Sequence, residues 1–256
     1  PPAGTPLAAN QFLPSVQQVG PAEAFVEYQY SHRLQIDVGY IGINNSPWLG
    51  SNYYNNMAAP ALTYQGAELN LNAGGGWMLT AIGFNAAQPS GQEGFDGLTL
   101  YNTGFDWGTG TALVTNQASA GTIALGANFI GWNNNENLRV WWYQFQDFAN
   151  LWYADNSVKF VASKDLTFNL GGQVGTEAAD YHNTLSNNGL GAPDSTFYGV
   201  QAGFNYKWFG LNLAFDDAFG SSNSFGQGAI VSPYTYGVAL DPLYTTPYMQ
   251  GLVDRA

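Results

Sequence analysis

The sequence contains no cysteine and little charge. Disulfides, thiolate metal sites and thiol catalysis are therefore excluded. Charged residues make up 9% of the 256-residue chain, against about 25% in ordinary globular domains, so a soluble surface rich in salt bridges is not expected. Six basic residues stand against 18 acidic ones, for a net charge of −12, and this balance excludes nucleic acid as a partner.

Long hydrophobic runs are also missing. No stretch of 18 apolar residues occurs, so no membrane helix is predicted, and no charged segment followed by an apolar run opens the sequence as a signal peptide would. An aromatic content of 16% excludes disorder. A membrane β-barrel stays open, because its strands are short segments of alternating polarity.

Alternation of apolar and polar residues is the strongest pattern present. In residues 33–40 every even position is apolar and every odd position is polar, charged or glycine, and similar alternation runs through 67–73, 166–174, 198–206 and 209–215. A period of two indicates a strand with one polar and one apolar face, and no segment shows a comparable helical stripe. The sequence therefore predicts an all-β fold.

Ten strands are expected, most of them about ten residues long, which suits a tilted strand that crosses a bilayer. Their expected ranges are 22–31, 34–43, 66–73, 77–86, 121–130, 138–146, 150–162, 166–175, 196–206 and 208–217. Short turns and long connections alternate between them, except at 147–149, where a short turn replaces a long loop. This asymmetry is typical of outer-membrane barrels, so we predict an antiparallel transmembrane β-barrel.

Strand parity assigns a face to each charged residue. Apolar positions are expected to meet outer-membrane lipid, with aromatic girdles near the strand ends, and polar positions to line an aqueous pore. The predicted pore-lining residues are Arg33, Asp37, Glu68, Arg139, Asp155, Lys159, Gln173 and Asp216. Acidic residues outnumber basic ones in this set, which favours cations or basic solutes. The alternative is that charges near the rims are screened by salt and have little effect.

Several short motifs resemble the OprD-like outer-membrane porins of Gram-negative bacteria. They are Pro47-Trp48-Leu49-Gly50 with the segments at 57–60 and 64–67, the aromatic hairpin at 138–153, and residues 241–245. The resemblance implies an eighteen-stranded monomeric pore, often assembled as a loose homotrimer, in contact with outer-membrane lipid and lipopolysaccharide. The chain departs from the family in one respect, because the family's ladder of basic residues along the pore is almost absent here.

The resemblance also gives residues 44–65 as a constriction loop folded into the pore. Aromatic and amide side chains in it would narrow the pore and hydrogen-bond polar solutes, and the predicted residues are Trp48, Asn52, Tyr53, Tyr54 and Tyr64. The alternative is an external loop packed on its neighbours. Both ends of the chain fall on the long-loop side, so we expect residues 1–256 to be a single domain from the interior of a longer barrel.

No catalytic or metal-binding pattern is recognised. The two histidines, His32 and His182, fall at a turn and in a long loop, where a solvated role is expected. We therefore predict that the chain is not an enzyme and needs no cofactor or metal. The predicted function is a passive outer-membrane channel for small polar solutes or ions. Two alternatives remain: a secreted β-sandwich that binds carbohydrate, and a surface barrel whose loops serve adhesion.

Overall fold

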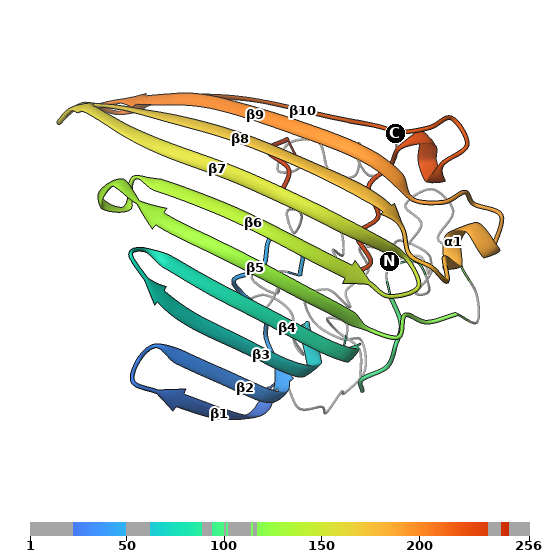
Figure 1. Ribbon diagram of the computed structural model, residues 1–256. Coiled ribbons are helices and arrows are strands. Elements are labelled where there is room, and N and C mark those ends of the chain that lie inside the picture. The colour runs from blue at the N-terminus through green and yellow to red at the C-terminus, as the bar shows by residue number, and fades with distance from the viewer. Residues whose placement is uncertain are drawn as a thin grey trace, which may run out of the picture.

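Ten antiparallel strands form one continuous sheet, in which each strand pairs with the next along the chain (Figure 1). The computed structural model describes residues 23–49, 62–88, 94–99, 101, 114, 117–234 and 242–245. The strands are β1 (Ala24–Tyr30), β2 (Leu34–Ile41), β3 (Thr63–Gly74), β4 (Trp77–Gln88), β5 (Thr122–Gly131), β6 (Glu136–Phe145), β7 (Ala149–Ser163), β8 (Leu166–Ala179), β9 (Asp194–Tyr206) and β10 (Phe209–Phe219).

The connections sort by length between the two ends of the strands. Short turns lie at one end of the sheet and long connections at the other (Figure 1). The turn at 146–148 is the exception, being short at the end of the long connections, as the sequence predicts. The prediction of ten antiparallel strands is confirmed. The two-sheet sandwich is wrong for the described part of the chain, because all ten strands belong to one sheet.

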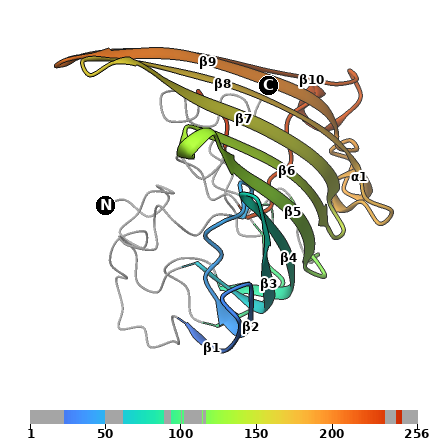
Figure 2. The same cartoon turned by 60° about the vertical axis from the view of Figure 1, so that its left-hand side comes forward.

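The sheet is curved. Figure 2 shows it bending from β1 to β10 like a section of a barrel wall, with β1 and β10 as its two edges. Helical structure among the described residues is limited to α1 (Thr184–Asn187) and the 3₁₀ turns η2 (Trp132–Asn134) and η3 (Phe225–Gln227). None of these is long and apolar enough to span a membrane.

The strand register fixes which side chains share a face. Asp37 on β2 lies opposite Glu27 on β1 and Glu68 on β3, so the three side chains point to the same side of the sheet. We call this side the inner face, and residues 43–49 and 229–234 lie against it. The outer face carries large exposed apolar side chains along the strands, among them Val38, Leu125, Trp152, Leu170, Val200 and Leu213.

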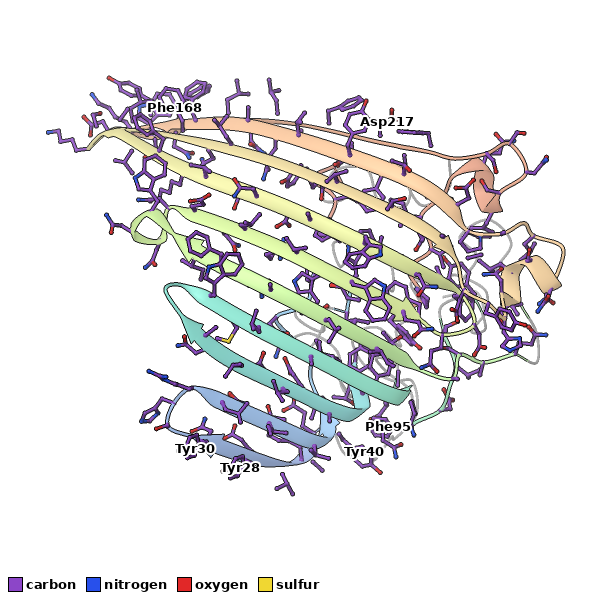
Figure 3. All side chains as sticks on the ribbon, in the orientation of Figure 1. Tyr28, Tyr30, Tyr40, Phe95, Phe168 and Asp217 are labelled. Atoms are coloured by element: carbon purple, nitrogen blue, oxygen red, sulfur yellow. The ribbon has the colours of Figure 1, made fainter. Side chains whose placement is uncertain are left out.

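Aromatic side chains gather near the short-turn end of the outer face. Figure 3 shows Tyr30 and Phe168 in this region, and both are exposed. Neighbouring rings pair there, with centroids 4.9 Å apart for Trp77 and Phe129 and 5.8 Å apart for Phe204 and Phe209. The arrangement agrees with the aromatic girdle expected from the strand ends.

The buried core lies on the inner face, in the half nearer the long connections. It is largely aromatic, and its fully buried members include Trp48, Tyr64, Trp141, Tyr143, Phe145, Tyr153 and Phe197. Apolar positions were expected to meet lipid, but these aromatic side chains lie on the inner face, where segments outside the strands pack against them. Two glycines provide space: a Cβ at Gly126 would overlap the Trp141 indole, and a Cβ at Gly175 would overlap the Phe197 ring.

Candidate functional site

The segment after β2 folds across the inner face of the sheet. Trp48 is 0% exposed and packs edge-on against Tyr153 of β7 and Phe197 of β9, with ring centroids 5.8 and 5.7 Å apart. The Ser46 hydroxyl lies 2.9 Å from the Tyr143 hydroxyl of β6. Because β2 and β9 are far apart in the sheet, this segment reaches across the wall and fills its concave side.

Residues after β10 occupy the same space from the other edge. The Tyr234 ring packs on Tyr64, Phe84 and Phe145, at centroid distances of 6.0, 5.1 and 6.5 Å. Burial raises the pKa of Tyr234 to about 12, so its hydroxyl is neutral at physiological pH. The backbone N–H of Val231 donates to a Glu177 carboxylate oxygen at 2.7 Å. Two segments far apart in sequence therefore close the aromatic half of the inner face together.

A polar chain begins on β6 and β7. Arg139 donates from Nε to both carboxylate oxygens of Asp155, at 2.9 and 3.0 Å, and its Nη2 contacts Asp155 Oδ2 as well. The Tyr153 hydroxyl lies 2.7 Å from Asp155 Oδ2 and 3.0 Å from Gln173 Oε1. A bidentate guanidinium–carboxylate pair has a fixed geometry, so these side chains are held in place on the inner face.

The chain of hydrogen bonds continues to β10 and to the segment at 242–245. Gln173 Nε2 donates to Asp216 Oδ1 at 2.6 Å, and the backbone N–H of Thr245 donates to Asp216 Oδ2 at the same distance. Burial, together with the nearby Asp155 charge, raises the pKa of Tyr244 to about 12. Asp216 thus has a partner on each oxygen, and the segment carrying Tyr244 is anchored over β8 to β10.

A second polar group lies on β1 to β3. Gln35 Nε2 donates to Glu27 Oε2 at 3.0 Å and to Asp37 Oδ2 at 2.9 Å. Asn70 Nδ2 donates to Glu68 Oε1 at 3.0 Å, and Asn70 Oδ1 accepts from Asn45 Nδ2 at 2.8 Å. These groups hold several carboxylates close together without a basic partner among the described residues. The inner face is thus acidic at this edge.

Comparison with known proteins identifies the architecture. No protein-family model matches the chain, and no curated protein matches its sequence. Solved structures do match: Pseudomonas aeruginosa OccK1 (OpdK) at a TM-score of 0.64 and 17% identity, over 80% of this chain and 50% of that one. OccK2 (OpdF) of the same organism, in complex with glucuronate, matches at a TM-score of 0.63 and 14% identity, over 77% of this chain and 48% of that one. The chain has the fold of these porins.

A third porin extends the comparison to another species. The BenF-like porin of Pseudomonas fluorescens Pf-5 matches at a TM-score of 0.61 and 13% identity, over 77% of this chain and 45% of that one. The chain therefore spans about half the length of the solved porins that it matches. The OprD-like fold expected from short motifs agrees with these matches.

The strand register places most of the predicted pore-lining residues on the inner face. Those on the strands are Asp37, Glu68, Arg139, Asp155, Lys159, Gln173 and Asp216. Lys159 is exposed near the short-turn end, whereas Asp155 and Gln173 are buried. Arg33 lies in the exposed turn between β1 and β2, where the sequence predicts a short turn, and its backbone N–H donates to the Tyr30 carbonyl. Its place along the pore stays a prediction.

The predicted constriction loop is placed in part. Trp48 lies on the inner face, whereas Asn52, Tyr53 and Tyr54 lie outside the described residues. The expected boundary at residue 65 is wrong, because Tyr64 belongs to β3 and pairs with Ile41 of β2. The Tyr64 side chain is nonetheless fully buried, and its hydroxyl donates to the Leu49 carbonyl at 3.1 Å.

Sequence reasoning missed several residues of this region. Tyr143 and Tyr153 lie at inner parity on β6 and β7, and the signal for them was the run of rings at both parities in the hairpin at 138–153. Tyr234 and Thr245 lie beyond β10, where no periodic pattern marks a contact with the sheet. Their placement depends on tertiary packing alone.

Proposed function

We propose that this chain forms part of the wall of a passive aqueous channel in the outer membrane of a Gram-negative bacterium. The proposal is supported by the porin fold, by the apolar outer face and by the segment after β2 that packs against the inner face. Solutes would cross down their gradients, sorted by width and by polar groups of the inner face. Lipopolysaccharide contact and a homotrimeric assembly stay predictions taken from the resemblance.

We further propose that the channel favours cations and small basic solutes, and the charge of the inner face carries this proposal. The described strands present six acidic residues there and two basic ones. The acids are Glu27, Asp37, Glu68, Asp155, Glu177 and Asp216, and the bases are Arg139 and Lys159. Arg139 is already bound to Asp155, so on the described strands Lys159 is the one further base at inner parity.

The solved neighbours provide a contrast. OccK2 is described in complex with glucuronate and OpdK with vanillate, and both ligands are carboxylates. A carboxylate solute needs basic partners along its path, and here the guanidinium of Arg139 is occupied by Asp155. We therefore assign this chain a different solute charge from that of these neighbours.

The test is the reversal potential of the channel in planar bilayers under a KCl gradient. Asp216 and Asp217 are adjacent on β10, so the strand register places Asp216 on the inner face and Asp217, which Figure 3 labels, on the outer face. We expect cation preference in the unaltered chain, reduced by Asp216→Asn and unchanged by Asp217→Asn. Anion preference, or an equal effect of the two substitutions, would contradict the assigned selectivity; absence of any conductance would contradict the channel.

A further inference from the structure

A small cavity lies where the segment after β2 meets strands β2 and β3. Its volume is about 280 Å³, and polar residues dominate its lining, including Gln35, Asp37, Asn44, Asn45, Glu68 and Asn70. All of these side chains offer an oxygen, and none of the lining residues is basic. The cavity is separate from the polar chain that runs across β6 to β10.

Asp37 is the central residue of this cavity. It is 8% exposed, and its Oδ2 accepts a hydrogen bond from Gln35 at 2.9 Å. Its Oδ1 is fully buried and has no hydrogen-bond partner among the described residues. The Oδ1 of Asn45, which also lines the cavity, is buried and unpartnered in the same way. Buried acceptors without a donor are costly, and two of them at one cavity indicate a missing electropositive group.

The negative charge around Asp37 also indicates a missing electropositive group. Glu68 lies directly opposite Asp37 across the β2–β3 ladder and is 7% exposed. Like charges directly opposite on neighbouring strands repel, and the repulsion is stronger away from water. Within the described part of the chain, the only ion pair joins Arg139 to Asp155. No basic side chain there neutralises Asp37 and Glu68.

We propose that Asp37, Glu68 and Asn45 bind a divalent metal cation of the calcium type. An all-oxygen donor set without sulfur or imidazole selects hard cations. A dication balances the two buried carboxylates, whereas a single ammonium group leaves one of them uncompensated. No three His, Cys, Asp or Glu side chains converge anywhere in the described residues, so amide oxygens and water complete the coordination. The cavity has room for several retained waters, at about 30 Å³ each.

The position of the site gives the ion a structural role. Asn45 belongs to the segment that carries Trp48, and Asn70 already links the Asn45 side chain to Glu68. A cation bound here would hold the segment after β2 against strands β2 and β3. This role is read out as folding stability, so the site is testable without any conductance measurement.

The experiment is an unfolding titration of the full chain, refolded in detergent micelles without lipopolysaccharide. The unfolding midpoint is measured in EDTA, then with CaCl₂, MgCl₂ or 1,4-diaminobutane at matched ionic strength. We expect calcium to raise the midpoint of the unaltered protein in a saturable way. Asp37→Asn and Glu68→Gln should weaken the apparent calcium affinity by at least about tenfold. A response to the diamine alone would overturn the metal assignment in favour of an organic cation.

The order of stabilities distinguishes binding from ordinary packing. In EDTA, Asp37→Asn removes the repulsion from Glu68 and should unfold at a higher midpoint than the unaltered chain, whereas in calcium the order should reverse. An unchanged order would overturn the proposal. Asp216→Asn is the matched control, because both oxygens of Asp216 already have partners, and it should keep the full calcium response. If Asp37→Asn does not fold, Asn45→Asp is measured instead. It should bind calcium more tightly than the unaltered chain, because it adds a charged ligand. An unchanged calcium affinity of Asn45→Asp would overturn the proposal.

Discussion

Replacing Trp48 by alanine tests whether the segment after β2 is packed onto the inner face of the sheet. The indole is 0% exposed and contacts rings of β7 and β9. A buried tryptophan removes about 150–250 Å² from solvent, which at about 25 cal/mol per Å² corresponds to about 4–6 kcal/mol. This is an upper bound, since the unfolded chain is already partly compact. Direct measurements on other proteins give about 3–5 kcal/mol for such truncations, and we expect that range for Trp48→Ala.

Trp48→Phe is the matched substitution. The indole Nε1–H is buried and has no acceptor among the described residues, a defect that costs about 1–3 kcal/mol. Phenylalanine removes this donor while keeping a ring against Tyr153 and Phe197, so the lost packing is partly offset. We expect Trp48→Phe to lower the free energy of unfolding by less than about 1.5 kcal/mol.

Two measurements check this pair. Urea unfolding in detergent, followed by far-ultraviolet circular dichroism, reports the loss of strands without depending on the altered fluorophore. Single-channel conductance should rise for Trp48→Ala and stay close to the original for Trp48→Phe, because only the first opens space beside Tyr153. Equal destabilisation by both substitutions would refute the reasoning about the unpartnered N–H. No destabilisation by alanine would refute the packing of the segment on the wall.

Three further substitutions test other parts of the protein. Burial raises the pKa of the Asp180 carboxyl, but hydrogen bonds, first among them the one from the Asp147 backbone N–H, outweigh it and lower the pKa below its usual range. The stability that this carboxylate contributes is therefore present above the unfolded-state pKa of about 3.9 and disappears as the pH falls through the folded-state pKa. Asp180→Ala should lower the free energy of unfolding by less than about 1 kcal/mol at pH 7 and should have no effect in strong acid. Urea unfolding at both pH values measures the difference. Gly175→Ala should lower the free energy of unfolding by about 1–3 kcal/mol, because the new Cβ overlaps the Phe197 ring. Gly172→Ala, on the outer face of the same strand, is the control. Its Cβ meets nothing within 4 Å, so the free energy of unfolding should be nearly unchanged in the same assay.

The strands were predictable because alternation of polarity extends through most of them. Their ends were less so. β3 begins at Thr63 rather than residue 66, since Gln65 and Gly66 flank a bulge that shifts the register and breaks the pattern. β8 continues to Ala179, beyond the expected 175, because the tight turn at 146–148 lets β7 begin early and pair with it. Pairing with a neighbouring strand, which a single sequence does not display, decided both boundaries.

The aromatic half of the inner face was not predictable from parity. Alternation separates two faces but does not tell which positions a distant segment covers. In the hairpin at 138–153, Trp141 and Tyr143 point inward while Trp142 and Trp152 point outward. Both faces of the hairpin therefore carry aromatic residues, and hydropathy does not distinguish the inner face from the outer one. Burial distinguishes them: the inward rings are covered by chain, whereas Trp152 is 58% exposed.

The two polar groups of the inner face are separated by β4 and β5, whose inner positions are small or uncharged, as at Thr80 and Gly126. The acidic group sits on β1 to β3, and the Arg139–Asp155 pair begins the second group on β6 and β7. The segment that carries Trp48 leaves β2 beside the first group, where Asn45 donates to Asn70, and its Trp48 ring packs against Tyr153 of the second. Its described part is thus held at one point by a hydrogen bond and at another by ring packing. A cation at Asp37 would act on channel width through the backbone of this segment, and not by entering the path of the solute.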